Sequence, residues 1–383
     1  MKFPPPKTFT VDGQIYPLPL KTIGPPPGEP SREELEYLAG FFDGDGCVTM
    51  AGRSVVLSVS QSIDSARVLL RFREAFGGGV RLSENRHGCC RAVLEWYICG
   101  NASRRAASLM ATVACLKQAE LKIASSRVSG LQLGTVRAKL KTLKKPTHIP
   151  MQFCGSWQYF SGFFDAEGCI VITQLFALRL IVRQNNRYIL EYLLKFLHQS
   201  HLDRWKLHGD NSSPSWVLVC EHRGTCLLTL RHLVDHGLSL KKPQADCVLE
   251  TKPSCDTNLA LREAVSGLSG QQSRFERLDG QGVLRAQAIQ RLQKKLRRSS
   301  CPKEAERLKE KIKKLQQKHA KGKLLCQIRT LKADICQNLS EGGYFVSSSE
   351  GVAAACRPTA ETNKKQCFSR TCENARSMFR IFV

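Results

Sequence analysis

The sequence predicts an α+β fold: two pseudo-symmetric αββαββα repeats followed by a basic helical C-terminal extension. The first observation is a duplicated segment, which reads YLAGFFDGDGCV at residues 37–48 and YFSGFFDAEGCI at residues 159–170, an offset of 122 residues. The second is the hydrophobic period, which is helical in each copy and changes to alternation at period two directly after it. The third is a run of charge, since residues 285–332 hold 17 Lys and Arg against three acids.

Small residues recur on one face of each duplicated segment. Gly40 and Gly44 are four residues apart, as are Gly162 and Ala166. Because the side chains at a contact set the distance between two helices, this pattern predicts that the two segments pack closely on each other. The glycines that follow, at positions 46 and 168, are expected to end the helices in the left-handed conformation.

Each segment ends in acids, Asp43 and Asp45 in the first copy and Asp165 and Glu167 in the second. A helix C-terminus carries partial negative charge, so carboxylates there are unfavourable. Two such ends pressed together would raise a carboxyl pKa or require a cation, and a hard divalent ion bound by oxygens meets that need. The alternative is a core helix with exposed acids near its end, which accounts for one copy but less well for two copies with the same pattern.

These residues resemble the LAGLIDADG homing endonuclease family. LAGFFDGDG at 38–46 fits the nine-position motif, and FSGFFDAEG at 160–168 is a looser copy with Glu at the eighth position. The resemblance covers roughly residues 32–252. It implies a single-chain, two-motif enzyme with saddle-shaped antiparallel sheets, which cuts both strands of a long DNA site.

The resemblance also implies a set of site residues. Asp45 and Glu167 match the eighth motif position and would bind two or more Mg²⁺ ions, for which Mn²⁺ can substitute, and the carbonyls of Gly44 and Ala166 would be further ligands. The acids two positions earlier are expected to cap or pack the helix end.

The family places a polar residue after the second strand, near the water or metal. Gln61 and Gln184 occupy that place, 16 and 17 residues beyond their acids, although an edge glutamine bonded to backbone is an alternative reading. Lys241 matches the family's lysine near the last helix. When Gln118 is aligned with Gln244, Cys115 falls opposite Lys241, which leaves Lys117 as the nearest substitute in the first copy.

The hairpin strands alternate apolar and polar residues, so one sheet face is expected to be open to DNA, with the solvent side of an ordinary antiparallel sheet as the alternative. The basic charge favours DNA, and Arg to guanine would be the most specific contact. The candidate DNA-binding residues are Thr49, Arg53, Ser54, Ser58, Arg81, Arg86 and Arg91 in the first repeat and Thr173, Arg179, Arg183, Arg204 and Lys206 in the second.

The chain divides by composition. The expected parts are a Pro-rich, extended lead-in at 1–30, the first repeat at 31–130, a basic linker at 131–152, the second repeat at 153–254, the basic helical extension at 255–338 and a disordered tail at 339–383. In the first repeat we expect a hairpin over 47–61, helices over 64–76 and 101–128, and a second hairpin over 80–98. The extension is expected to break at Pro302 and near Gly322.

Composition narrows the class of protein. A net charge of +25 and a pI near 9.6 predict a polyanionic partner, with nucleic acid favoured over a membrane surface. The sequence contains no run of about 18 apolar residues, so no membrane span is predicted. The 17 cysteines lack a disulfide or zinc framework, which is typical of a reducing compartment and argues against secretion. For a protein that acts on DNA, we expect an intracellular, DNA-containing compartment such as a plastid, mitochondrion or nucleus. We expect a monomer with internal pseudo-twofold symmetry.

Three functions fit these patterns. The first is a site-specific, Mg²⁺-dependent double-strand DNA endonuclease of intron homing. The second is an RNA-binding intron maturase on the same fold, with intron RNA as partner, which the basic extension motivates. The third is a nuclease-dead DNA-binding protein. An acid at both eighth positions favours the endonuclease.

Overall fold

A computed structural model of the chain gives the fold. It describes residues 5–52, 54–85, 91–126, 133–145, 155–173, 177–209, 215–251, 255–268, 278–299 and 301–341. The chain divides into two units, residues 1–331 and residues 332–383, and the elements below belong to the first unit, apart from the end of the last helix. In the described part of the chain, no helix is both long enough and apolar enough to cross a membrane.

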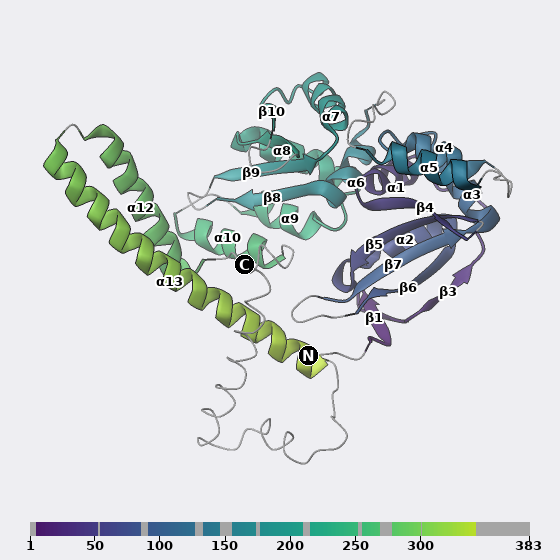
Figure 1. The fold of residues 1–383 in the computed structure, drawn as a ribbon, viewed down its shortest axis with the longest axis horizontal. Coiled ribbons are helices and arrows are strands. Elements are labelled where there is room, and N and C mark those ends of the chain that lie inside the picture. Colours follow the sequence, from purple (N-terminus) through teal and green to yellow (C-terminus); the bar gives the residue numbers. More distant parts are fainter. Residues whose placement is uncertain are drawn as a thin grey trace, which may run out of the picture. The chain divides into compact units, whose positions relative to one another are not determined.

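The first repeat places its helices against one face of an antiparallel sheet (Figure 1). The sheet order is β6-β7-β5-β4, extended at one edge by β3. Its buried face carries Val48, Leu57, Val59 and Trp96, none more than 1% exposed. The elements are α1 (Arg32–Asp45), β4 (Gly46–Ala51), β5 (Ser54–Ser62), α2 (Arg67–Phe76), β6 (Gly78–Glu84), β7 (Val93–Cys99), α3 (Gly100–Met110) and α4 (Gln118–Ser125).

The second repeat has the same plan. Its sheet order is β10-β11-β9-β8, which matches β6-β7-β5-β4 strand for strand. The elements are α6 (Trp157–Glu167), β8 (Gly168–Ile172), β9 (Leu178–Gln184), α7 (Arg187–Gln199), β10 (Trp205–Gly209), β11 (Trp216–Cys220), α8 (Arg223–Asp235) and α9 (Lys242–Glu250). The predicted α+β architecture of two pseudo-symmetric repeats is therefore confirmed.

Local boundaries follow the sequence signals in most places. Ser31 accepts a hydrogen bond from the Glu34 N–H at 3.2 Å and begins α1, and the β4–β5 hairpin turns at Gly52. The single helix expected over 101–128 is wrong, because α3 and α4 are separate helices and residues 111–117 interrupt them. The interruption brings Lys117 to the start of α4.

The Pro-rich lead-in is more ordered than expected. Residues 8–23 form three strands, β1 (Thr8–Val11), β2 (Gln14–Pro17) and β3 (Leu20–Ile23), and β3 pairs with β6 at the sheet edge. Phe9 is 3% exposed in the first core. The signal that we overlooked is Asp12-Gly13, a two-residue turn with both φ angles positive, which is typical of a tight hairpin.

The motif helices α1 and α6 approach each other through glycine. A Cβ on Gly40 would lie 2.1 Å from the Tyr159 carbonyl oxygen, and a Cβ on Gly162 would lie 1.9 Å from the Tyr37 carbonyl oxygen. Backbone therefore contacts backbone at both crossings, and any side chain at these positions would separate the helices. The predicted packing of the two segments is confirmed.

Both motif helices end differently from expectation. Gly46 has φ −74° and ψ 158°, and Gly168 has φ −79° and ψ 158°, so neither is left-handed. Each is the first residue of a strand, β4 or β8, so the chain is already extended there. Glycine is needed here because there is no room for a side chain, not because of the backbone conformation. A Cβ at Gly46 would lie 2.4 Å from the Phe42 ring, and one at Gly168 would lie 2.5 Å from the Phe164 ring.

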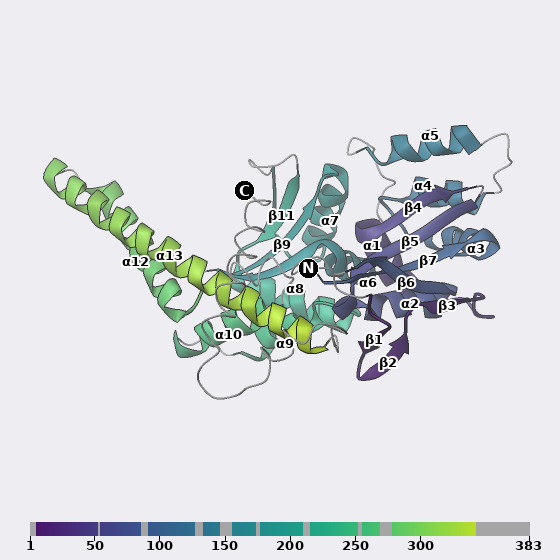
Figure 2. The same ribbon diagram turned by 60° about the horizontal axis from the view of Figure 1, so that its bottom comes forward.

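The basic linker contains a helix, α5 (Leu133–Leu143), beside the β4 side of the first repeat (Figure 2). Leu140 is 4% exposed, and Arg137 donates a hydrogen bond to the Gly52 carbonyl at 3.2 Å. The centre of this segment is thus packed structure rather than an extended connection.

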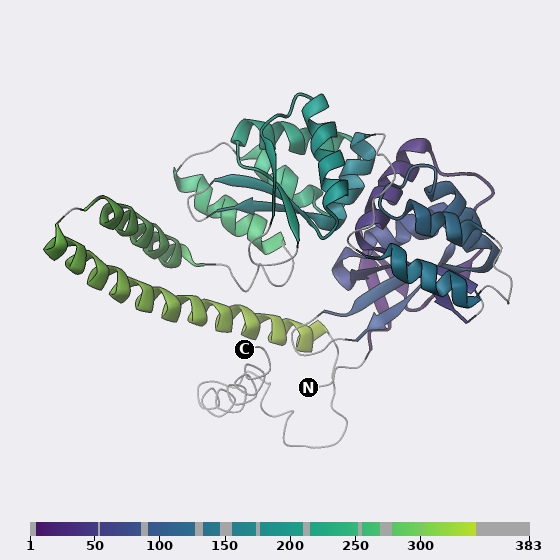
Figure 3. The same cartoon turned by 45° about the horizontal axis from the view of Figure 1, so that its top comes forward.

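The extension is helical. α10 (Cys255–Leu268) packs on the second repeat, since Leu261 and Val265 belong to its core. α12 (Gly280–Arg298) and α13 (Pro302–Glu341) form an antiparallel hairpin (Figure 3). The break before Pro302 is confirmed, but the break at Gly322 is wrong. One glycine costs a helix only about 1 kcal/mol relative to alanine. Here a Cβ would lie 2.3 Å from the Arg285 guanidinium of α12.

The glycine contact between α1 and α6 gives a stability prediction. Gly40→Ala should lower the free energy of unfolding by about 3 kcal/mol or more, because the new methyl would overlap a backbone carbonyl. Gly134→Ala is the matched control, since Gly134 lies in α5 with nothing within 4 Å of a Cβ, and it should be neutral or slightly stabilising. Urea unfolding of both variants measures the difference. Equal stabilities would contradict the close approach.

Candidate active site at the repeat interface

Two acids end the two motif helices side by side. Asp45 is the last residue of α1, and Glu167 is the last residue of α6. A Cβ on Gly44 would lie 2.4 Å from the Ala166 Cβ and 3.1 Å from the Glu167 Cγ, so the helix ends are in direct contact. The arrangement anticipated from the duplicated segment, with acids from both copies in one place, is what the fold produces.

Burial raises the pKa of both carboxyls, and the charge of Asp45 adds to the shift at Glu167. Burial is the main cause that raises the pKa of Glu167 to about 7, and the neighbouring charge of Asp45 is the next. The pKa of Asp45 is also raised, chiefly because protein atoms displace water from the carboxylate, although the residue as a whole is exposed. Lys117 and Lys241 act in the opposite direction on both acids.

A glutamine holds each acid. Gln61 of β5 donates from Nε2 to Oδ2 of Asp45 at 2.6 Å, and Gln184 of β9 donates from Nε2 to Oε1 of Glu167 at 2.8 Å. The side-chain Oε1 of Gln184 also accepts from the Asn185 N–H at 2.7 Å, so the bond to backbone that we considered as an alternative exists beside the acid contact. The two glutamines are equivalent in place and in partner.

The two lysines are equivalent too, which corrects the alignment that placed Cys115 opposite Lys241. Lys117 immediately precedes α4, and Lys241 immediately precedes α9. The Lys117 amine donates to the carbonyls of Phe42, Asp43 and Gly44 at 2.8, 2.6 and 3.1 Å, and the Lys241 amine donates to the Asp165 carbonyl. The alignment failed because pairing Gln118 with Gln244 makes this segment four residues longer in the second copy, whereas it is two residues longer.

Burial of these amines has an electrostatic consequence. Loss of solvent lowers the pKa of Lys117 and of Lys241, while the nearby carboxylates, Asp45 and Glu167 among them, raise it. Two cations and two anions thus share the space where the helices meet.

Asp43 and Asp165, the earlier acids, bond to the loops that precede α4 and α9, a role that the expected capping or packing of their own helix ends did not include. Asp43 is fully buried and accepts the N–H groups of Cys115, Leu116 and Lys117 at 2.7 to 2.9 Å. Asp165 is 2% exposed and accepts the N–H groups of Ser239, Leu240 and Lys241 at 2.6 to 3.0 Å. Their oxygens are occupied by these bonds.

The oxygen donors fit a hard divalent cation. Oδ1 of Asp45 and Oε2 of Glu167 accept no hydrogen bond from the residues that the structure describes, and the Gly44 and Ala166 carbonyls lie at the same helix ends. The Gly44 carbonyl already accepts one bond from Lys117, which leaves its second lone pair. Within the described ranges, no group of three or more His, Cys, Asp or Glu could hold a metal, so a site here would need the backbone carbonyls beside the two carboxylates.

Comparison with known proteins finds similar solved structures but no match to a protein family or a curated sequence. No protein-family model matches the chain, and no curated protein matches it. Among solved structures it is similar to the LAGLIDADG meganuclease I-AabMI bound to uncleaved DNA, with 14% identity over 61% of this chain and 96% of that chain and a TM-score of 0.45.

Two further solved structures are similar at the same level. One is the meganuclease I-SmaMI bound to uncleaveable DNA, with 12% identity over 62% of this chain and 99% of that chain and a TM-score of 0.44. The other is the LAGLIDADG homing endonuclease I-GzeII in complex with a DNA target, with 12% identity over 60% of this chain and 97% of that chain and a TM-score of 0.40.

The candidate DNA-binding residues of the first repeat are placed unevenly. Thr49 and Ser54 are exposed, whereas Ser58 is only 8% exposed and offers little surface to a partner. Arg81 is exposed but pairs with Glu95 at 2.7 Å, and Arg91 pairs with Asp64. Arg53 and Arg86 lie outside the described residues.

The second repeat has the freer basic face. Arg183, Arg204 and Lys206 are exposed, and within the described ranges no carboxylate pairs with them. Arg179 pairs with Glu221 at 2.9 Å, and Thr173 accepts the Ala177 N–H at the hairpin turn. His208 shares this face because it is two residues beyond Lys206 on β10.

Sequence reasoning missed the roles of two tyrosines. Tyr37 and Tyr159 are each 1% exposed, and each phenol donates to the buried aspartate of the other repeat. The signal was present, because a tyrosine precedes both copies of the nine-residue motif.

The raised pKa of Glu167 predicts how stability depends on pH without divalent ions. In the folded state Glu167 titrates at about 7, whereas an ordinary Glu titrates near 4.5, so the folded protein binds the extra proton between these values. Its contribution is therefore fully present below about pH 4.5 and is lost as pH rises through about 7. Glu167→Gln should remove this loss, which is about 3 kcal/mol at most.

Urea unfolding in chelator between pH 4.5 and 8 measures this dependence. Asp45→Asn, which keeps Glu167 but removes the neighbouring charge, should move the loss to lower pH. An identical pH dependence in wild type and Glu167→Gln would show that Glu167 titrates normally.

Proposed function

We propose that this protein is a site-specific double-strand DNA endonuclease that hydrolyses phosphodiesters with Mg²⁺. The observation that carries the proposal is the paired constellation at the helix ends: an acid, a glutamine and a lysine in each repeat, in equivalent places. Asp45, Gln61 and Lys117 form one set, and Glu167, Gln184 and Lys241 form the other. Two equivalent sets about one axis suit a substrate with two antiparallel strands.

The proposed ligands are the two free carboxylate oxygens and the carbonyls of Gly44 and Ala166. When bound there, Mg²⁺ neutralises charge on the phosphate and lowers the pKa of a water. The glutamines fix the orientation of each carboxylate by holding one oxygen, which directs the other toward the shared space. Each lysine supplies a positive charge near the phosphate while its backbone N–H is held by a buried aspartate.

The open sheet faces are the proposed surfaces for DNA. Base reading there would come chiefly from arginines that are not paired with acids, Arg183 first among the described residues. Arg81 and Arg179 would first have to leave Glu95 and Glu221, so they are better suited to phosphate, where exchange of one anion for another costs little.

The α12–α13 hairpin is proposed as an additional, sequence-independent contact with DNA. Its exposed basic residues include Arg291, Arg297, Arg307, Lys311 and Lys318, and between residues 285 and 332 only three acids oppose 17 Lys and Arg. Those acids form local pairs with Lys295, Lys309 and Lys314, so most of the positive charge is uncompensated. A 40-residue helix is about 60 Å long, enough to follow a phosphate backbone for more than one turn of DNA.

The acids give the direct test of catalysis. Asp45→Asn and Glu167→Gln should each reduce double-strand cleavage by about a hundredfold or more, because each removes a proposed ligand charge but keeps the side-chain shape. DNA binding should stay near the wild-type level. Cleavage of a plasmid library and of selected targets in Mg²⁺ is the measurement.

Asp203→Asn is the matched control, since Asp203 is an exposed acid outside the site, and it should cleave like wild type. Ca²⁺ should support binding with little turnover. Wild-type rates in either site variant, or full activity in chelator, would contradict the proposal. Tight binding of intron RNA without cleavage of any DNA would favour the maturase function instead.

The hairpin gives a salt-dependence prediction. Replacing Lys311, Lys318 and Lys321 together by Gln should reduce the slope of log K against log salt for non-specific duplex DNA by up to about 3, because each phosphate that is no longer neutralised reduces the slope by roughly 0.9. The same change at Lys7, Lys21 and Lys122, which are exposed elsewhere, should leave the slope unaltered. Equal slopes for both triple variants would exclude the hairpin from DNA binding.

A further inference from the structure

Two buried tyrosines connect each repeat to the lysine of the other. The Tyr37 hydroxyl on α1 donates to Oδ2 of Asp165 on α6 at 2.7 Å, and the Tyr159 hydroxyl on α6 donates to Oδ2 of Asp43 on α1 at 2.5 Å. These are reciprocal bonds between the repeats. All four side chains are at most 2% exposed, so no water competes for them.

Each aspartate also accepts hydrogen bonds from a loop of its own repeat. Asp165 accepts three successive N–H groups, from Ser239 to Lys241, and Asp43 accepts three from Cys115 to Lys117. Counting the phenol, each carboxylate accepts four hydrogen bonds. Bonds to a buried charged acceptor are among the stronger ones in proteins, and loss of one would leave the carboxylate under-satisfied.

The loops end at the lysines of the proposed active site. Lys241 and Lys117 each donate their backbone N–H to Oδ1 of the aspartate and turn the amine back to carbonyls at the end of the motif helix. A lysine side chain is long and flexible, so the place of its amine depends on where the backbone is held. The aspartate fixes that backbone, and the tyrosine of the other repeat fixes the aspartate.

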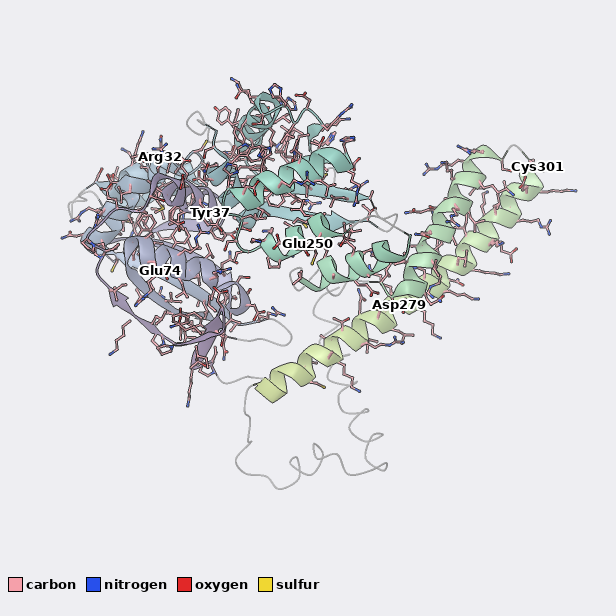
Figure 4. All side chains as sticks on the ribbon, turned by 180° about the vertical axis from the view of Figure 1, so that it is seen from behind. Arg32, Tyr37, Glu74, Glu250, Asp279 and Cys301 are labelled. Carbon is pink, nitrogen blue, oxygen red and sulfur yellow. The ribbon has the colours of Figure 1, made fainter. Side chains whose placement is uncertain are left out.

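Residues of the two loops also pack into the hydrophobic core of the opposite repeat. Cys115 of the first repeat lies in the core of the second, and Leu240 of the second packs on the core of the first. Tyr37 is itself held by Arg71, whose guanidinium lies 3.6 Å from the ring centroid and which also pairs with Glu34. Figure 4 labels Tyr37 where the ribbons of the two repeats meet.

We propose that Tyr37 and Tyr159 are positioning residues, each of which places the lysine of the opposite repeat through a buried aspartate. The proposal rests on the proposed function for the role of the lysines, but the crossed connection itself does not. Its consequence is that neither site is complete within its own repeat.

Backbone amide exchange of the full-length protein, without DNA or divalent ions, tests the connection without any cleavage. Tyr37→Phe should raise the exchange rates of the amides at 239–241 by about tenfold or more and leave those at 115–117 unchanged. Tyr159→Phe should give the mirrored pattern. Tyr192→Phe is the matched control, because the Tyr192 hydroxyl is in no described hydrogen bond, and it should alter neither segment.

The amides of β7 serve as the internal reference for general loosening. Faster exchange in β7 together with both loops would mean a merely structural role and would overturn the proposal. No change in either loop, or a change only in the repeat that carries the substituted tyrosine, would also overturn it.

Strand-specific nicking supplies the functional readout. Tyr37→Phe and Lys241→Met should slow cleavage of the same DNA strand. Tyr159→Phe and Lys117→Met should slow cleavage of the other strand. Equal slowing of both strands by either tyrosine variant would contradict positioning. If wild type cut no DNA at all, the proposed endonuclease function would fail, whereas the exchange result would still decide the crossed connection.

Discussion

The absence of side chains where α1 and α6 cross is the constraint on which the rest of the structure depends. With Gly40 against the Tyr159 carbonyl and Gly162 against the Tyr37 carbonyl, the two helix axes are closer than any pair of side chains would permit. That distance decides whether Asp45 and Glu167 share one space or lie apart. It also decides whether the phenols of Tyr37 and Tyr159 reach the aspartates across the interface. Sterics at two positions therefore set the electrostatics at the helix ends.

The charges at those ends are balanced more fully than the sequence indicated. From the acids alone, we expected either a raised carboxyl pKa or a cation between the helices. The structure brings Lys117 and Lys241 to the same place, and both lower the pKa of Glu167 while its burial and Asp45 raise it. The lysines also bond to carbonyls at the helix ends, where the helix dipole is negative. A fold with two acids pressed together is thus tolerated before any divalent ion binds, and the ion would add to this balance rather than create it.

The sequence predicted what repeats and periods encode. The duplicated segment led to the paired helices, the two αββαββα repeats and the positions of Asp45 and Glu167, because equal spacing in two copies maps to equal places in the fold. The resemblance added Gln61 and Gln184. Prediction failed where a residue's role depends on contacts distant in the chain. The bond between Tyr37 and Asp165 spans 128 residues, and the tyrosine that precedes each motif does not reveal its partner across the interface. Lys117 was misaligned because Gln118 and Gln244 were paired although they are not equivalent. The turn at Asp12-Gly13 was hidden among prolines that we read as extended chain.

The one chemical difference between the two sites has a consequence of its own. The first copy ends in Asp45 and the second in Glu167, one methylene longer, and the carboxyl of Glu167 is the one whose pKa reaches about 7. A carboxyl must lose its proton before it can bind a cation, so near neutral pH the ion proposed here would compete with a proton at Glu167 more than at Asp45. The two sites, which have matched glutamines and lysines, would then differ in how readily they bind the divalent ion. Such an asymmetry would arise because burial acts on both carboxyls but the charge of Asp45 adds to it only at Glu167, since the other partners in the two sets are the same in kind.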